Sequence, residues 1–503
     1  MYRRPSPGQL SFVDFYLPFG GRLAADNRWV QLAAMIPWEA FEASYAKQFS
    51  AGQGAPAKSF RIALGALLIK EKLGLSDEET VQQVQENPYL QYFLGFHEYL
   101  EEAPFDASMM THFRKRLSPQ LLAEVNQQVV AAALIAAADE ATGESSDDEE
   151  PPPGGGDGIL KAAPLPAQGC PPSEGEADIE HQGRLLLDAT VTPADIRYPT
   201  DLDLLHQARA SSERILDELY QSLPTPLAKK PRTYRQQARR AYLAVAKQRR
   251  VTAKVRRKAV GQQLRYLRRN LKHIDDLLAA GASLSCLKPY WYRRLLVIHE
   301  VYRQQWQMYE QRQHRIDHRI VSLSQPQVRP IVRGKAGTPV EFGAKIALSC
   351  VSGYAVLERL SWEAFNEAGD LIEQVERYRE RWGCYPVSVH ADQLYRTRAN
   401  RAWCKARGIR LSGPPLGRPK AAHKAALTRQ AQADAAIRNG IEGKFGQGKR
   451  RFGWSRVMAK LAATAETSIA ITVLVMNLEQ RLRAWALFWW RFFSGWSGAV
   501  IIL

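Results

Sequence analysis

The sequence predicts an α/β protein in which a mixed sheet carries flanking helices, with a helical N-terminal region and a helical insertion. Short apolar runs rich in β-branched residues indicate the strands: RLLLDATV, PVEFGAKIALSCV, YAVLERLSW and YPVSVHAD. Helical segments such as LIEQVERYRERWG and TRANRAWCKARG separate the later runs. The resulting order is strand, long interruption, two strands, helix, strand, helix, strand, helix, which is an α/β arrangement.

The composition indicates a large and strongly basic protein. The chain has 503 residues, a formal net charge of +18 and a pI near 9.7. Since domains usually run to roughly 100–200 residues, we expect more than one. The charge favours a polyanionic partner, with nucleic acid ahead of an anionic membrane surface. The five cysteines form no C-x-x-C pair and the N-terminus has no signal-peptide core, so we expect reduced thiols in a cytoplasmic protein.

Residues 1–140 are expected to form a helical N-terminal domain. RIALGALLIKEKLGL has apolar residues at helical spacing, and Ser76 with Glu79 three residues later predicts a capping box for the next helix. A short helix then begins near Asp106 or Ser108 and ends before Pro119.

That short helix carries a basic face. We predict that this face contacts a DNA backbone, as helix-turn-helix modules do. The alternative is a surface helix with ordinary solvated charges. The residues concerned are Arg114, Lys115 and Arg116.

Residues 141–180 predict a disordered linker. The segment begins with ESSDDEEPPPGGGDG and stays rich in proline and glycine, so it cannot bury much apolar surface. The domain that contains the sheet is then expected in two pieces, residues 181–204 and 326–480. Within the second piece, Ser352 and Gly353 mark the turn of a predicted hairpin.

The interruption, residues 205–325, predicts a basic helical hairpin. No Asp or Glu occurs between Lys229 and Ile274, whereas Lys and Arg are frequent. Phosphates of nucleic acid are the expected partner of this charge, although a solvated face is the common alternative. An apolar seam at spacings of four and three predicts a long helix packed on a partner helix, and it consists of Val260, Leu264, Leu267, Leu271, Ile274 and Leu278.

The last residues, 481–503, form an aromatic hydrophobic tail that includes AWALFWWRFFSGWSGAVIIL. A membrane span needs about 20 predominantly apolar residues. This stretch is barely that long and carries Arg491 with a Gly/Ser break. We therefore predict packing against the core or another subunit rather than a membrane anchor.

Three acidic residues in separate contexts suggest a metal site for cutting DNA. Asp188 and Asp392 each end an apolar, strand-like run, and Glu442 lies in a basic segment. A carboxylate at the carboxyl end of a strand lies where open α/β sheets keep their sites. Mg²⁺ takes carboxylate oxygens, and two such ions can clamp the attacking and leaving oxygens of a phosphodiester. Each acid alone is weak evidence, because strand-end Asp and surface Glu are common.

The surroundings of Glu442 strengthen the pattern. Arg438 lies four residues before it and Lys449 seven after, spacings that share one helical face and would direct two cations toward phosphates. The preceding AAHKAALTRQAQADAAIR is a good helix former, so the helix is expected to begin there. Four glycines argue against a strong helix at this point, namely Gly440, Gly443, Gly446 and Gly448.

Several long motifs in order resemble the DDE transposases of bacterial insertion sequences, most closely insertion-sequence family five. They are LLLDATVTPADIRYPTDLDLLHQAR, IVRGKAGTPVEFGAKIALSCVSGY, VSVHADQLYRTRANRAWCKARGIRLSGPPLGRP and RNGIEGKFGQGKRRFGW, with FYLPFGGRLAADNRWVQLAAMIPWEAFEASYAKQF near the N-terminus. Together with the helices that follow this last segment, they cover most of the chain outside the linker, the insertion and the tail.

The resemblance implies an RNase H-like catalytic fold and a metal-binding triad of Asp188, Asp392 and Glu442. The family pattern Arg-x₃-Glu-x₆-Lys is present as Arg438, Glu442 and Lys449. Two positions depart from the family. Ala435 stands where a tyrosine is expected, which leaves a phosphate or base contact there in doubt, and Gln393 stands where relatives often have lysine, while Tyr395 remains.

The resemblance also implies a reaction. Asp188 would bridge two Mg²⁺ ions, with Mn²⁺ as a substitute, and Asp392 and Glu442 would each hold one. The enzyme would cut double-stranded DNA at the element's terminal inverted repeats and join the 3′-hydroxyls to target DNA. The N-terminal domain, residues 1–140, would bind the terminal repeats. The enzyme would act in the bacterial cytoplasm at the nucleoid, as a homodimer or larger assembly when synapsed, with no small-molecule cofactor.

Three alternatives remain open on the sequence. One is a metal-dependent nuclease without strand transfer, the second a catalytically dead DNA-binding relative, and the third a membrane-associated basic protein. Histidines offer further candidates. His390 shares a strand face with Asp392 but is expected to be a packing residue, and the zinc-like pair His314 and His318 lacks an evident third ligand.

Overall fold

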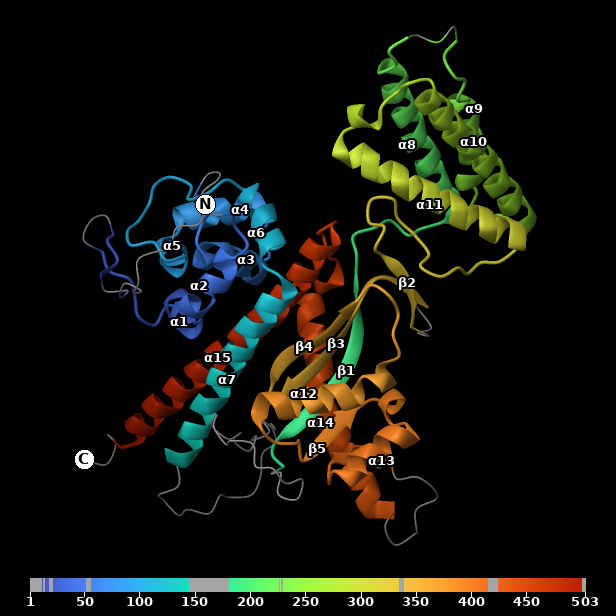
Figure 1. Ribbon diagram of the computed structural model, residues 1–503. Helices are drawn as coiled ribbons and strands as arrows, with labels where there is room; N and C mark the ends of the chain where they lie inside the picture. The colour runs from blue at the N-terminus through green and yellow to red at the C-terminus, as the bar shows by residue number, and fades with distance from the viewer. Residues whose placement is uncertain are drawn as a thin grey trace.

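The computed structural model describes residues 11, 14–17, 21–50, 56–143, 181–225, 227, 229–333, 339–414 and 424–499. Figure 1 shows N-terminal helices, a central sheet and a projecting helical insertion. The N-terminal helices are α1 (Arg28–Met35), α2 (Trp38–Ala46), α3 (Phe60–Leu73), α4 (Asp77–Glu86), α5 (Pro88–Phe93), α6 (Met109–Arg116) and α7 (Pro119–Gly143). The strands are β1 (Arg184–Pro193), β2 (Arg329–Val332), β3 (Val340–Val351), β4 (Tyr354–Ser361), β5 (Ser388–Ala391) and β6 (Arg410–Leu411). The remaining helices are α8 (Asp201–Gln221), α9 (Arg235–Ala246), α10 (Ala253–Ala279), α11 (Pro289–Gln311), α12 (Leu371–Trp382), α13 (Arg398–Ala406), α14 (Lys424–Arg450) and α15 (Ala462–Ala499).

The sheet is mixed, as the sequence predicted, and its order is that of an RNase H-like fold. The strands run β2–β3–β1–β5–β6, and β4 also pairs with β3. β1 pairs antiparallel with β3 and parallel with β5, which pairs parallel with β6. The predicted hairpin turn is confirmed, since Ser352 and Gly353 both have positive φ (49° and 82°), the backbone conformation of a tight hairpin turn.

β1 is longer than the apolar run suggested. It continues to Pro193, because its second half pairs with β3 as far as Gly343. Asp188 therefore lies in the middle of the strand and not at its end, which corrects the sequence-based placement. It follows directly on Leu187, whose pairing with Ala391 is the last between β1 and β5. Asp188 thus stands where the pairing with β5 ends and β1 continues paired with β3 only.

The N-terminal helices share a core with the sheet. One cluster joins α3 and α6 to α14, α15 and the face of β1 and β3 that carries Leu186 and Leu348. The other face is covered by α12, α13 and part of α7, where Val130 and Leu134 pack with Leu187. The proposed boundary at residue 140 consequently falls inside α7, which is shared between the two parts. Within the N-terminal part, the Ser76–Glu79 capping box is present.

α14 remains helical through all four glycines. The expected start upstream of Arg438 is confirmed, but the expected weakness of the helix is not seen. A Cβ added at Gly448 would overlap the ring of Trp454, which is 1% exposed, whereas one added at Gly443 would meet nothing. Gly448 is therefore required by close packing, which the sequence pattern did not reveal.

These two glycines should respond oppositely to alanine. Gly448→Ala is expected to lower the free energy of unfolding by about 1–3 kcal/mol, because the buried Trp454 ring must move. Gly443→Ala, the matched control on the same helix, should raise it by up to about 1 kcal/mol, since alanine favours a helix. Urea denaturation of both variants measures the difference. Equal shifts would contradict the packing role of Gly448.

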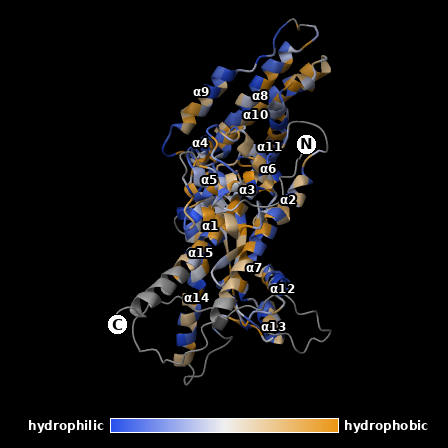
Figure 2. Cartoon of the chain, turned by 90° about the vertical axis from the view of Figure 1, so that its left-hand side faces the viewer, coloured by the Kyte–Doolittle hydropathy of each residue, from blue (hydrophilic) through white to orange (hydrophobic). Residues whose placement is uncertain are grey.

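The described residues of the insertion form four α-helices, α8 to α11, so the expected two-helix hairpin was incomplete. The predicted seam is confirmed on α10, where Leu264, Leu267 and Ile274 are buried, but it packs chiefly against α8 and less against α11. α8 contributes Leu205, Ile215 and other apolar residues that lie before the basic run. The insertion helices are striped blue and orange in Figure 2, as expected for helices that bury one face.

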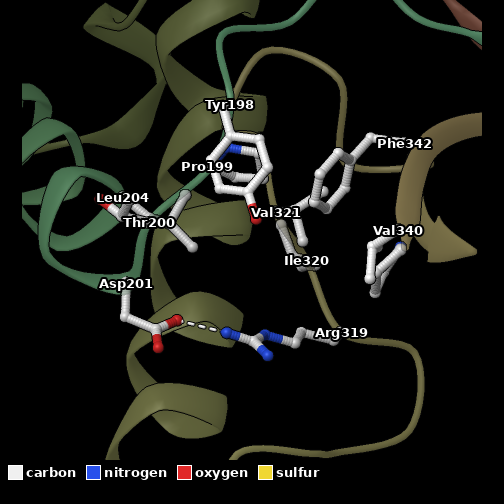
Figure 3. A pocket seen from close by; sticks show the side chains of 11 residues that line it. Tyr198, Pro199, Thr200, Asp201, Leu204, Arg319, Ile320, Val321, Val340 and Phe342 are labelled. Carbon is white, nitrogen blue, oxygen red and sulfur yellow. Dashed lines mark hydrogen bonds and ion pairs between the residues drawn. The ribbon is translucent and has the colours of Figure 1, made fainter. Parts of the chain in front are cut away.

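The insertion joins the sheet domain through two neighbouring segments. The chain that leaves β1 and the chain that returns to β2 line a cavity of about 220 Å³ (Figure 3). Across it, the Arg319 guanidinium lies 2.5 Å from the Asp201 carboxylate, and the Tyr198 and Phe342 rings meet edge to face at 5.5 Å. These contacts fix the base of the insertion.

Two predictions concern the linker and the tail. The linker falls almost wholly on residues 144–180, outside the described residues. The predicted tail does not form a separate segment as far as Ala499, because α15 continues without a break across residue 481. Leu482, within the predicted tail, packs against the core.

By length and composition, one stretch of the described residues, Pro119–Ala138 in α7, could cross a membrane. Part of it is buried against α15 and β4, and a core helix passes the same test.

Candidate active site

Asp188 and Asp392 are brought together by the pairing of β1 with β5. Asp392 follows β5 directly and caps the short 3₁₀-helix η5 (Gln393–Tyr395), where its Oδ1 accepts a hydrogen bond from the Gln393 N–H at 2.7 Å. The Asp188 Oδ1 accepts one from the Ala189 N–H at 2.8 Å. Two carboxylates from separate parts of the chain therefore lie next to each other, one within β1 and the other just after β5.

The surroundings of Asp188 disfavour its negative charge. Burial, together with the nearby carboxylates of Glu367 and Asp392, raises the pKa of Asp188 to about 6, against the opposing effects of the Ala189 N–H and Arg438. A carboxyl group in this position gains from a cation, because a positive charge offsets both the burial and the repulsion.

Glu442 is linked to Asp392 through Arg438. Both residues lie on α14, and the Arg438 Nη2 is 3.0 Å from the Glu442 Oε1. The Arg438 Nη1 is 3.8 Å from the Asp392 Oδ1. The guanidinium thus supplies the positive charge between the second and third acids of the predicted triad. Asp392 and Glu442 keep 47% and 49% of their side-chain surface exposed, so both remain open to a ligand.

The donor set fits a hard divalent cation, although the acids are not drawn together around one point. Carboxylates from β1, the end of β5 and α14 are the ligand type that Mg²⁺ prefers. Within the described part of the chain, however, no group of three or more His, Cys, Asp or Glu side chains is close enough to hold a metal ion. A cation at this site would compete with Arg438 for Asp392 and Glu442.

The other predicted DNA-contacting residues differ in accessibility. Lys449 is half-buried on α14. The Arg114 guanidinium makes two bonds to the Asp77 carboxylate, at 3.0 and 2.5 Å, and the Arg116 guanidinium lies 4.2 Å from the Phe49 ring centroid. Only Lys115 of the α6 cations is exposed. Arg114 and Arg116 are thus engaged within the N-terminal helices, and their contact with DNA stays a prediction.

Buried Asp434 fastens α14 to the sheet and was not identified from the sequence. Asp434 on α14 receives two hydrogen bonds of 2.9 Å from the Arg410 guanidinium of β6. The His390 ring lies 3.7 Å from Asp434 and 3.0 Å from the Ser388 hydroxyl. The signal was available, because Asp434, Arg438 and Glu442 repeat every four residues on one helical face.

The positions of the candidate histidines in the structure show what each of them contacts. His390 is fully buried, and that burial lowers its pKa to about 4, so the ring is neutral and acts in packing. His318 lies 2.9 Å from Glu363, beyond the end of α11, and forms no metal-binding group with His314 in the described part of the chain. Glu367, whose charge acts on Asp188, lies in the 3₁₀-helix η4 (Glu367–Gly369) and pairs with Lys345 at 2.8 Å; no sequence pattern pointed to it.

Two family models match this chain. One, described as a transposase DDE domain, covers residues 389–479, and the other, described as a transposase domain (DUF772), covers residues 18–116. The first includes Asp392 and Glu442, and Asp188 precedes it. A relative from Rhizobium meliloti, named "Uncharacterized protein ORF8 in nfe locus", is 34% identical over 179 residues, which is 36% of this chain and 68% of the relative. No solved structure matches.

These matches agree with the independent features of the fold. The sheet has the strand order expected of an RNase H-like domain, and the second acid follows β5 within the matched DDE domain. The helical N-terminal part coincides with the second family match. The chain belongs to the DDE transposases of insertion-sequence type.

Proposed function

We propose that this transposase cuts the ends of an insertion sequence and joins the resulting 3′-hydroxyls to target DNA by metal-dependent phosphoryl transfer. The observation that carries the proposal is the adjacency of Asp188 and Asp392, linked through Arg438 to Glu442. Burial and two neighbouring carboxylates disfavour the charge of Asp188, which prepares the site for cations.

In this proposal, Asp188, Asp392 and Glu442 hold two Mg²⁺ ions, for which Mn²⁺ can substitute. Bound ions of this kind activate an attacking oxygen and neutralise charge on the phosphoryl group. With cations on the carboxylates, Arg438 would be available for a DNA phosphate, and Lys449 would contact a phosphate further along α14. The substrates are the terminal inverted repeats and target DNA, and synapsis of two ends requires at least a dimer.

The test is a cut-and-join assay with the full chain. The substrate is a plasmid carrying the native flanks of this reading frame, with a second plasmid as target and Mg²⁺ or EDTA. We expect Mg²⁺-dependent cleavage at the repeats and joined product in the target. Cleavage without joining would instead identify a nuclease.

A catalytically dead DNA-binding relative is the second candidate. The ion pairs of Arg438 with Asp392 and Glu442 favour it, because they satisfy two acids without a metal. Such a protein would bind the same plasmid with steep salt dependence and cut it under no metal condition.

A further inference from the structure

A second cavity lies in the insertion, between the beginning of α10 and the end of α11. Its volume is about 570 Å³, and it is lined by residues of both helices together with Asp201. Five of the lining residues carry basic side chains, which are Lys254, Arg256, Arg257, Arg312 and His314. The one acidic lining residue, Asp201, is already bound by Arg319 and Gln305, at 2.5 and 2.8 Å.

Three of the basic side chains at this cavity are not paired with an acidic side chain in the described part of the chain. Lys254, Arg256 and Arg312 are exposed, and none of them has an ion pair with any residue that the structure describes. The first turn of α10 contains no acidic residue. Several unpaired positive charges around one hollow repel each other, and a bound anion lowers this repulsion.

One side of the cavity is built to hold a guanidinium in place. Arg257 lies over the Tyr309 ring, with its Cζ 4.3 Å from the ring centroid. Gly261, one turn further along α10, permits this approach, because a Cβ there would overlap the Tyr309 ring. A guanidinium stacked on an aromatic ring keeps its N–H groups free for an oxyanion, so it is oriented in advance for a phosphate.

We infer that this cavity binds the phosphate backbone of duplex DNA, as a second contact outside the catalytic centre. The inference rests on the proposed function for the identity of the polyanion. The insertion projects from the end of the sheet where β1 leaves it, away from β5 and α13 (Figure 1). DNA held there would be a segment other than the one at Asp188 and Asp392. Contacts to phosphates carry no sequence information, so this surface positions DNA without reading it.

The experiment compares two triple variants of the full chain. The cavity variant is Lys254→Gln with Arg256→Gln and Arg312→Gln. The control is Lys272→Gln with Lys288→Gln and Arg293→Gln, which removes the same charge from exposed residues of the same domain, at the opposite ends of α10 and α11. Affinity for a random-sequence 40-base-pair duplex is measured by fluorescence anisotropy across a series of salt concentrations.

We expect the cavity variant to bind on the order of 10²-fold more weakly at about 0.1 M salt, with a salt slope less steep by about 2–3, since each phosphate contact contributes roughly 0.9. The control should lose less than about threefold. Equal losses in the two variants would overturn the inference while leaving the transposase proposal intact. Failure of the wild-type chain to bind the duplex at low salt would count against both.

A second experiment tests whether the cavity binds the phosphates of a lipid surface instead of those of DNA. Phosphatidylglycerol vesicles present phosphate oxygens on a lipid surface, and they are tested by flotation with the same two variants. Loss of vesicle binding in the cavity variant, with DNA binding unchanged, would overturn the inference in favour of a lipid headgroup. Unchanged vesicle binding with weakened DNA binding would support the assignment to DNA.

Discussion

Asparagine in place of Asp188 is expected to reduce DNA cleavage at least about 10³-fold, because metal ions held by carboxylates supply several kcal/mol of transition-state stabilisation. Asp392→Asn and Glu442→Gln should have losses of the same order. All three substitutions keep the size of the side chain and remove its charge. Single-turnover cleavage of the repeat-bearing plasmid in Mg²⁺ measures the effect.

The control for this series is Glu373→Gln. Glu373 is 63% exposed on α12 and pairs with Arg377, so its loss removes one negative charge from the same domain without touching the three acids. It should cut at the wild-type rate. A similar rate for Asp188→Asn and Glu373→Gln would remove the basis for a metal-dependent reaction at these three acids.

The same Asp188→Asn variant should be more stable than the wild-type protein above neutral pH. In the folded state the pKa of Asp188 is about 6, against 3.8 as the ordinary value. The folded protein therefore holds this proton more tightly than the unfolded chain. The group's contribution to stability is complete below about pH 4 and is lost as the pH rises through 6. Asparagine does not titrate and avoids this loss.

The size of the gain follows from the shift. A difference of about two pKa units corresponds to about 3 kcal/mol in the free energy of unfolding. Urea denaturation without divalent cations should show this gain at pH 8 and almost none at pH 4. Glu442→Gln, whose carboxylate is half exposed and bound to Arg438, should show no such gain. A gain for Asp188→Asn that is independent of pH would rule out burial of charge as its cause.

Much of the site could be predicted from the sequence, because its parts are encoded locally. The run YPVSVHAD gave β5 and placed Asp392 at its end, and the spacing of Arg438 and Glu442 gave their contact on one face of α14. The position of Asp188 could not be judged in the same way. An apolar run stops where burial changes, whereas β1 ends where its pairing with β3 ends.

Features that depend on distant partners were missed. The commitment of Arg114 to Asp77 depends on the packing of α6 against α3 and α4, and Gly448 is required only by a ring six residues later that folds back onto α14. The count of helices in the insertion was wrong for a related reason. The prediction was based on the basic run and its apolar seam. The helix that packs on this seam, α8, precedes the basic run in the sequence and was not recognised as its partner.

Two neighbouring segments form the base of the insertion, and the ion pair between Asp201 and Arg319 joins them. This arrangement explains why the sheet tolerates so large an interruption. The sheet requires only that the segment leaving β1 and the segment returning to β2 lie close together. The four helices between them pack against one another in a core of their own. The entropy of closing a loop grows only slowly with its length, and a folded insert with adjacent ends costs less still. A gene can therefore lengthen, replace or lose the sequence between these two points while the register of β1 with β3 and β5 is preserved.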